Sequence, residues 1–139
     1  MLEILQTESH GEQLIPMAPQ DIPAGFPVPI DDGESLSIDL NAELIPHPES
    51  TFCGRVRGES MAGEDIHDGD ILVIDKSLDW HDGSTVVAYI NGEFTVKTIA
   101  RVNGQYTLMP ANPEYRPIPI VEGDEVRIWG VVKWVIHRK

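Results

Sequence analysis

The sequence has little of several features that would each define a class of protein. It contains one cysteine, Cys53, in 139 residues, which excludes an internal disulfide; next to Phe52, it is expected to be a small core residue. No apolar run approaches the roughly 18 to 20 residues of a membrane helix, and the N-terminus lacks the basic flank of a signal peptide. We therefore expect a soluble, cytoplasmic chain with one core.

Basic residues are absent from the first 50 positions. This segment contains ten acids and carries a formal charge of −10, whereas residues 51–139 hold all ten bases and carry −3. Binding to nucleic-acid phosphates requires a clustered basic surface, which releases counterions from the phosphates. We therefore expect no direct nucleic-acid binding, and protein partners are favoured.

Proline punctuates the same N-terminal segment. Proline removes a backbone donor and biases the preceding residue toward extended conformations, so residues 1–45 are predicted to form an extended acidic arm and residues 46–139 a β-rich domain. Residues 36–44 fit either a helical turn or an edge strand. The prolines of the first 48 positions are Pro16, Pro19, Pro23, Pro27, Pro29, Pro46 and Pro48.

Short β-rich segments follow Phe52. Residues 86–90, 93–102 and 105–109 are separated by two Asn-Gly pairs, which favour the tight type I′ turns of antiparallel strands. Residues 71–74 and 126–136 are predicted as two further strands, the second with a bulge at Gly130. The expected fold class is mostly β, compact and largely antiparallel.

Common catalytic and ligand-binding motifs are missing. The five histidines have no metal-ligand spacing, and the stretch 65–70 lacks the register and final Glu of a calcium loop, so it is predicted to be a polar turn. No Walker loop, dinucleotide fingerprint or Gly-x-Ser-x-Gly motif occurs. We expect no metal and no cofactor.

Two residues remain as candidates for chemistry. Ser60 follows Gly58 in a predicted turn, and Lys97 is an isolated lysine inside the predicted strand 93–102. Each has an ordinary interpretation, because a serine near a glycine is usually a turn residue or helix cap and a strand lysine usually extends to solvent. The local pattern alone leaves both interpretations open.

Four segments occur in a fixed order and spacing: Gly58-Glu59-Ser60-Met61, residues 67–75 (HDGDILVID), residues 91–97 (NGEFTVK) and Trp129-Gly130-Val131-Val132. In residues, order and spacing they resemble the LexA-like self-cleaving peptidase family. Two upstream segments, 24–29 (AGFPVP) and 38–41 (IDLN), resemble the SOS mutagenesis proteins of that family. The resemblance runs from Ala24 to Val132 and implies the family's compact β fold.

The resemblance also implies the role of each site residue. Ser60 is the implied nucleophile and Lys97 its general base, with the backbone amides of Glu59 and Ser60 as the oxyanion hole. The bond cut is expected to be Ala24-Gly25, where small side chains let an extended segment approach the nucleophile. The best-known SOS mutagenesis proteins carry Cys before the scissile Gly, and Ala is usual in the LexA branch.

A general-base lysine must meet a physical requirement. A free lysine has a pKa near 10.4, so only about one molecule in 2,500 is neutral at pH 7. Lowering the pKa to about 7 requires about 4.6 kcal/mol, which full burial can supply. Lys97 is therefore predicted to be buried. Strand alternation places it on one face with Glu93, Thr95 and Ile99, and Glu93 would oppose the shift unless it points away.

The resemblance implies three interaction partners, and two alternative functions for the chain are considered beside it. Activation by a RecA filament on single-stranded DNA is expected, after which the 25–139 product forms a homodimer and joins a UmuC-like Y-family polymerase. One alternative is a non-catalytic β interaction module with the same fold. The other is a LexA-like or phage-repressor-like regulator, which needs a helix-turn-helix domain that 24 acidic, proline-bearing residues cannot supply. A signal peptidase would require a membrane anchor.

Overall fold

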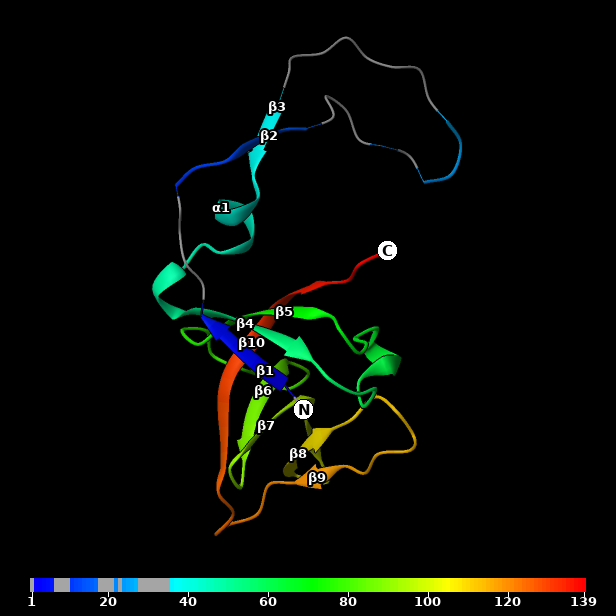
Figure 1. Cartoon of the computed structure of the whole chain (residues 1–139). Helices are drawn as coiled ribbons and strands as arrows, with labels where there is room; N and C mark the ends of the chain where they lie inside the picture. Colours follow the sequence, from blue (N-terminus) through cyan, green and yellow to red (C-terminus); the bar gives the residue numbers. More distant parts are fainter. Residues whose placement is uncertain (1, 7–10, 18–21, 23, 28–35) are drawn as a thin grey trace. The chain divides into compact units, whose positions relative to one another are not determined.

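The computed structural model describes residues 2–6, 11–17, 22, 24–27 and 36–139 (Figure 1). The chain divides into two units, one made of residues 1–8 with His47–Lys139 and the other of Ser9–Pro46. We describe each unit by itself. Within the described residues, no helix has the length and hydropathy needed to span a membrane.

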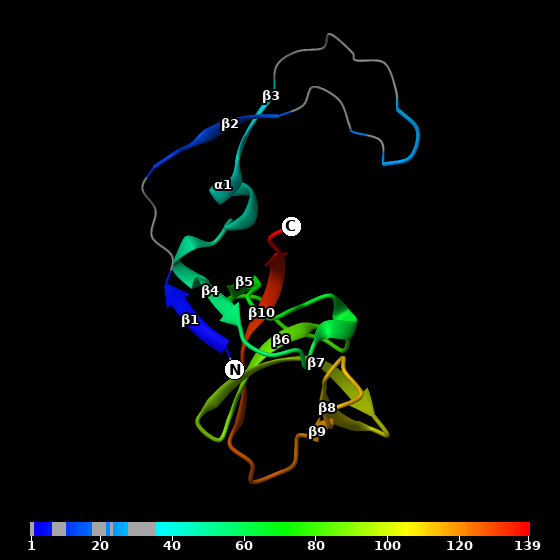
Figure 2. The same ribbon diagram turned by 45° about the vertical axis from the view of Figure 1, so that its right-hand side comes forward.

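An eight-stranded sheet forms the larger unit, and every neighbouring pair of strands in it is antiparallel (Figures 1 and 2). The mostly β, largely antiparallel fold class is therefore confirmed. In spatial order the strands are β1 (Leu2–Gln6), β4 (Thr51–Val56), β5 (Ile71–Asp75), β10 (Val126–Ile136), β6 (Thr85–Ile90), β7 (Glu93–Val102), β8 (Gln105–Met109) and β9 (Ile118–Pro119).

Two Asn-Gly turns connect β6, β7 and β8, as predicted. Asn91 and Asn103 have φ values of 47° and 51°, and the glycine after each is also in the positive-φ region. Type I′ turns require positive φ at both central positions, which explains these pairs. The predicted bulge in β10 is also present, as a register shift between Ile128 and Gly130. A Cβ at Gly130 would lie 2.6 Å from Ile74 Cγ2, so the close strand contact requires glycine.

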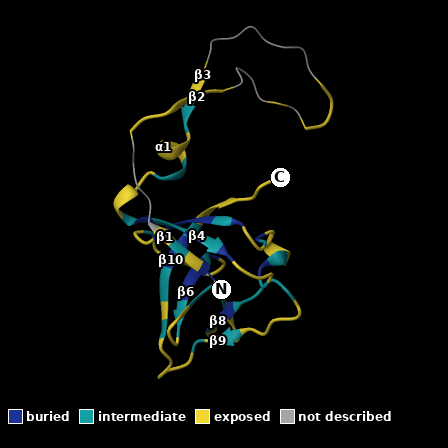
Figure 3. Ribbon diagram, in the orientation of Figure 1, coloured by how far each residue is buried: buried dark blue, intermediate teal, exposed yellow. Residues whose placement is uncertain are grey.

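The buried positions, dark blue in Figure 3, lie mainly on the strands of the larger unit. Apolar side chains of these strands and of the loop after β4 form a core cluster. Met61 and Val96 belong to the same buried cluster, although 35 positions separate them in the sequence. Cys53 is half-buried and its burial raises the pKa of the thiol, which fits a packing role. The cluster consists of Leu2, Val56, Met61, Ile66, Leu72, Ile74, Val87 and Val96.

The smaller unit combines both structures that the sequence left open for residues 36–44. Strand β3 (Leu36–Asp39) pairs with β2 (Leu14–Met17), and helix α1 (Leu40–Leu44) follows at once. Asp39 caps the helix, since its carboxylate accepts a hydrogen bond from the amide of Asn41 at 3.1 Å. Two short 3₁₀ helices, η1 (Pro48–Ser50) and η2 (Ala62–Glu64), lie in the larger unit.

Strand β1 differs from the arm that the sequence predicts from residue 1 to residue 45. Residues 2–6 pair with β4 in the sheet, and residues 9–46 form the separate unit. The physical reason is apolar alternation, because Leu2 is buried in the core cluster and Ile4 packs against it. Residues 2–6 therefore belong to the sheet of the larger unit and not to the predicted arm.

Candidate active site

Ser60 lies in the loop between β4 and η2, and its neighbours fix the backbone on both sides. The next residue, Met61, is 2% exposed in the core cluster. The carbonyl of Ser60 accepts a hydrogen bond from the Ala111 amide at 2.8 Å, and the Gly63 amide donates to the Ala111 carbonyl at 2.6 Å. The loop is thereby joined to residues after β8, and Ser60 itself is partly exposed.

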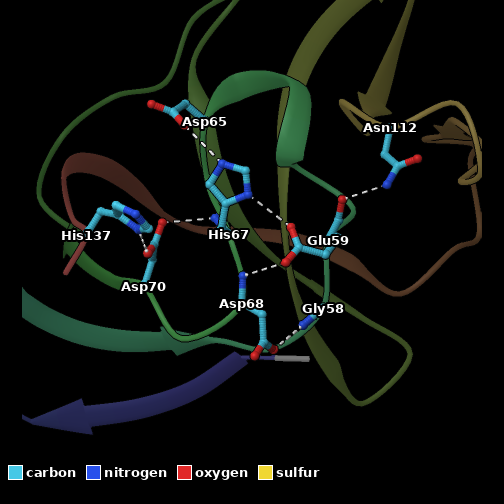
Figure 4. A network of polar contacts seen from close by, with 8 residues as sticks. All are labelled: Gly58, Glu59, Asp65, His67, Asp68, Asp70, Asn112 and His137. Atoms are coloured by element: carbon cyan, nitrogen blue, oxygen red, sulfur yellow. Dashed lines mark hydrogen bonds and ion pairs between the residues drawn. The ribbon is translucent and has the colours of Figure 1, made fainter. Parts of the chain in front are cut away.

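A polar network holds the residues before Ser60 (Figure 4). The Gly58 amide donates to Asp68 Oδ1 at 2.8 Å, and the Asp68 amide donates to Glu59 Oε1 at 3.3 Å. Asn112 Nδ2 donates to the Glu59 carbonyl at 2.8 Å. Gly58 has φ 94°, a conformation that a residue with a side chain adopts only with strain. These contacts orient the backbone that presents the hydroxyl.

Lys97 reaches Ser60 from the middle of β7. Its Nζ lies 3.2 Å from Ser60 Oγ, 2.6 Å from Thr95 Oγ1 and 3.0 Å from the Val96 carbonyl oxygen. The residue is 5% exposed. A neutral amine has two hydrogens and one lone pair, so it can donate to Thr95 and to the Val96 carbonyl while accepting the Ser60 hydroxyl proton.

Burial lowers the pKa of Lys97 below its ordinary value of about 10.5, because the ammonium loses its hydration. Among the described residues, no carboxylate forms an ion pair with Lys97. Glu93, which shares its strand face, is exposed at the hairpin end of β7. The surroundings therefore favour the neutral amine.

His67 lies beside Glu59 in a different electrostatic environment (Figure 4). Its Nε2 is 3.0 Å from Asp65 Oδ1 and its Nδ1 is 3.1 Å from Glu59 Oε2. These two carboxylates, Asp65 first, raise the pKa of His67 above its ordinary value. Asp70 is buried, yet hydrogen bonds from the His67 amide and from His137 hold the pKa of its carboxyl below the ordinary value.

Comparison with known proteins decides the family. Residues 16–133 match the model of the Peptidase S24-like family. The chain belongs to this family. Among its relatives, MucA of Salmonella typhimurium is 43% identical over 120 residues, covering 85% of this chain and 81% of MucA. SamA of the same species is 39% identical over 138 residues, covering 99% of this chain and 96% of SamA.

A repressor also appears among the relatives of this S24-like chain. The LexA repressor of Syntrophotalea carbinolica is 38% identical over 136 residues, which cover 96% of this chain and 64% of the repressor. The resemblance to UmuD-like proteins of the LexA family is therefore confirmed. Family membership and these relatives support a self-cleaving serine peptidase of the SOS response.

The structure brings together some of the residues that the sequence predicts for the active site. Ser60 and Lys97 are in contact, and Glu59 and Ser60, whose amides are the predicted oxyanion hole, are adjacent residues of the loop that follows β4. Among the described residues, none accepts a hydrogen bond from either amide. Ala24 and Gly25 are exposed residues of the smaller unit, in a bend that extends to Phe26.

Sequence reasoning missed two contributors to the site. Thr95 makes the shortest contact to the Lys97 amine, and Asn112 holds the Glu59 carbonyl. Strand alternation already placed Thr95 on the face of Lys97, so a signal for its proximity was present. No local signal indicates Asn112, which lies 53 positions from its partner.

Proposed function

We propose that the chain cuts its own Ala24-Gly25 bond, with Ser60 as nucleophile and Lys97 as general base. The observation that carries the proposal is the 3.2 Å contact between Ser60 Oγ and the buried Lys97 amine, whose pKa is lowered. Nucleophilic catalysis requires a hydroxyl in contact with a general base, and a lowered pKa makes the neutral, proton-accepting form of the lysine more abundant.

Acylation follows from the contacts of the amine. Ser60 Oγ forms a bond to the Ala24 carbonyl carbon while its proton passes to Lys97 Nζ, and the carbonyl oxygen becomes an oxyanion. The amides of Glu59 and Ser60 donate hydrogen bonds to this oxyanion. When the carbonyl re-forms, the bond to the Gly25 nitrogen breaks and Lys97 returns the proton to the new amine. Ala24 is then an ester of Ser60.

Deacylation uses the same base. Lys97 takes a proton from a water molecule, whose oxygen bonds to the ester carbon, and Ser60 leaves with that proton as a hydroxyl. Thr95 Oγ1 and the Val96 carbonyl, at 2.6 and 3.0 Å, keep the lone pair of the neutral amine directed at Ser60. The products are residues 1–24 and 25–139.

The wider role that we propose is that of an SOS switch. A RecA filament on single-stranded DNA would accelerate cleavage, and the 25–139 product would act as a homodimeric subunit of a UmuC-like Y-family polymerase. The net charge of −13 favours protein partners over direct contact with DNA. The relationship to MucA and SamA supports this context.

Incubation of the purified chain at about pH 10, where more lysine is neutral, tests the chemistry. Mass spectrometry should find the two fragments 1–24 and 25–139, and Ser60→Ala and Lys97→Ala should both remain intact. Persistence of the intact parent would support the non-catalytic interaction module. Cleavage of both variants at the parental rate would exclude Ser60 and Lys97 as nucleophile and general base.

A further inference from the structure

Strand β1 lies on the part of the chain that the proposed cut releases. It pairs with β4 through five residue pairs, from Leu2 opposite Val56 to Gln6 opposite Phe52, and forms the outer strand of the sheet. The cut between Ala24 and Gly25 separates β1 from β4. The inference that follows rests on this proposed cut.

The side chain of Leu2 occupies a specific seat on β4. Leu2 is 7% exposed and belongs to the core cluster, and Ile4 packs against that cluster. Gly54 creates the space, because a Cβ at this position would lie 2.7 Å from Leu2 Cδ1. Leu5 is 39% exposed, as expected for the alternate position of a strand. Two aliphatic side chains at alternate positions therefore attach β1.

Leu2 also lines a groove of about 600 Å³. Besides Leu2, its walls include Ile90 at the end of β6, Phe94 and Thr95 of β7, and Ile118 of β9. Removal of Leu2 would widen this groove toward β4. The widened surface combines apolar walls with a strand edge, the combination that binds extended peptides.

Cleavage changes the way in which β1 is held. In the intact chain, residues 7–50 connect the end of β1 to β4, so the strand pairs intramolecularly at a high effective concentration. After cleavage, the fragment is held only by one short strand pair and by the side chains of Leu2 and Ile4. Rebinding then costs the translational and rotational freedom of a separate molecule. The fragment should therefore leave.

We propose that cleavage opens the edge of β4 at residues 52–56 as an acceptor site for a strand of a partner protein. The edge then presents unpaired backbone donors and acceptors, which are templates for strand addition. β1 defines the chemistry of the occupant, which is an extended segment with aliphatic side chains at positions i and i+2. The first aliphatic side chain takes the Leu2 seat over Gly54.

A labelled peptide of residues 1–9 (MLEILQTES) is the probe, and its binding is measured by fluorescence anisotropy. The first protein is the product of self-cleavage, freed of fragment 1–24 by size exclusion. The second is intact Ser60→Ala. The third is intact Ser60→Ala with Leu2→Asp and Ile4→Asp, which detach β1. The matched control is intact Ser60→Ala with Leu5→Asp, which places the charge on the exposed face of β1.

The cleaved product and the Leu2→Asp, Ile4→Asp protein should bind the probe at least about tenfold more tightly than the other two proteins. Hydrogen exchange should show that the probe protects amides of residues 52–56. A probe with Leu2→Asp should lose binding, and one with Leu2→Val should retain it. Equal binding to all four proteins, or protection elsewhere, would overturn the proposal.

Two further outcomes also count against the proposal. If fragment 1–24 co-elutes with residues 25–139 at micromolar concentration, the edge stays occupied. If the cleaved product self-associates through residues 52–56 and the probe dissociates it, the occupant is a second copy and not a partner protein. Failure of self-cleavage is a separate result, because the detached variant and intact Ser60→Ala still compare an open edge with a closed one.

Discussion

Lys97 and His67 are two basic side chains that contact adjacent residues of one loop, and their environments differ in both hydration and charge. Lys97 Nζ contacts Ser60 and two neutral oxygen atoms, and its side chain is buried. His67 contacts the carboxylates of Glu59 and Asp65, and its side chain is 36% exposed. Burial lowers the pKa of Lys97, whereas the carboxylates raise the pKa of His67.

The difference shows that two basic side chains beside the same loop are suited to two different roles, one as a proton acceptor and one as a cation between carboxylates. A proton acceptor must be neutral when the serine attacks, which favours a dry site without acids. A cation that links carboxylates must stay protonated, which favours partial exposure beside acids. We infer that Lys97 carries the proton in the reaction and that His67 stabilises the backbone before Ser60. The predictions below test this division.

Arginine substitutions should separate the two residues most strongly. Arginine remains protonated at every accessible pH, so Lys97→Arg keeps the positive charge but cannot accept the Ser60 proton. Self-cleavage at about pH 10 should fall by roughly 1,000-fold or more. His67→Arg keeps a cation beside Glu59 and should stay within about threefold of the parent. Mass spectrometry of the fragments over time measures both. Cleavage by Lys97→Arg at the parental rate would refute the general-base role.

Removing the buried amine should stabilise the fold. In a Ser60→Ala background, Lys97→Met replaces a poorly hydrated amine by an apolar side chain of similar length, and the free energy of unfolding should rise by about 2 kcal/mol at neutral pH. Lys133→Met, at an exposed position of β10, is the control and should change it little.

The sign of the pH dependence follows from the lowered pKa of Lys97. The unfolded lysine binds its proton more tightly than the folded one, so parental stability rises between the folded pKa and about 10.5. The advantage of Lys97→Met should therefore be largest at neutral pH and shrink as the pH approaches 10.5. Urea unfolding at several pH values measures it. An advantage that grows with pH would contradict a lowered pKa.

Local sequence rules predicted the central strands and β10 but not the N-terminal strand β1. Asn91-Gly92 and Asn103-Gly104 determine both turns of the β6–β8 meander through their positive φ values, so the turns and register follow from four residues. Strand β1 has no such turn. It is stabilised by contacts with β4, about 50 positions away, which a local pattern does not contain. Strand β2 includes Pro16, which a short two-stranded sheet tolerates at its edge.

The candidate site shows the same limit. Ser60 and Lys97 are 37 positions apart, and their 3.2 Å contact depends on Met61 and Val96 packing in one cluster. The local sequence therefore did not decide whether Ser60 and Lys97 form a catalytic pair. The ordered segments that resemble the family led to that prediction. The need for burial was predictable from the pKa of lysine alone. The face that Thr95 shares with Lys97 followed from alternation, but its 2.6 Å contact depends on the side-chain conformation of Lys97.

Thr95→Val should change the reaction through the amine that it contacts. Valine keeps the β-branched shape but removes the acceptor 2.6 Å from Nζ. The ammonium loses a stabilising contact, so the midpoint of the pH–rate profile should move to lower pH, while the plateau rate should fall about fivefold because the amine is less well oriented. Thr95→Ser restores the hydroxyl and should restore both. A lower plateau with an unmoved midpoint would indicate a packing defect instead.

His67→Asn should have the smallest effect of these variants. The pH dependence that His67 gives to the stability of the fold should have the opposite sign to that of Lys97. Because the carboxylates raise the pKa of His67, its stabilising contribution is complete below the unfolded pKa of about 6.5 and is lost as pH rises through the folded pKa. In a Ser60→Ala background, His67→Asn should lower Tm at about pH 6 and match the parent at about pH 9. His81, whose Nδ1 contacts only a backbone carbonyl, provides the control His81→Asn. If the difference in Tm persists at high pH, His67 acts by packing and not as a cation.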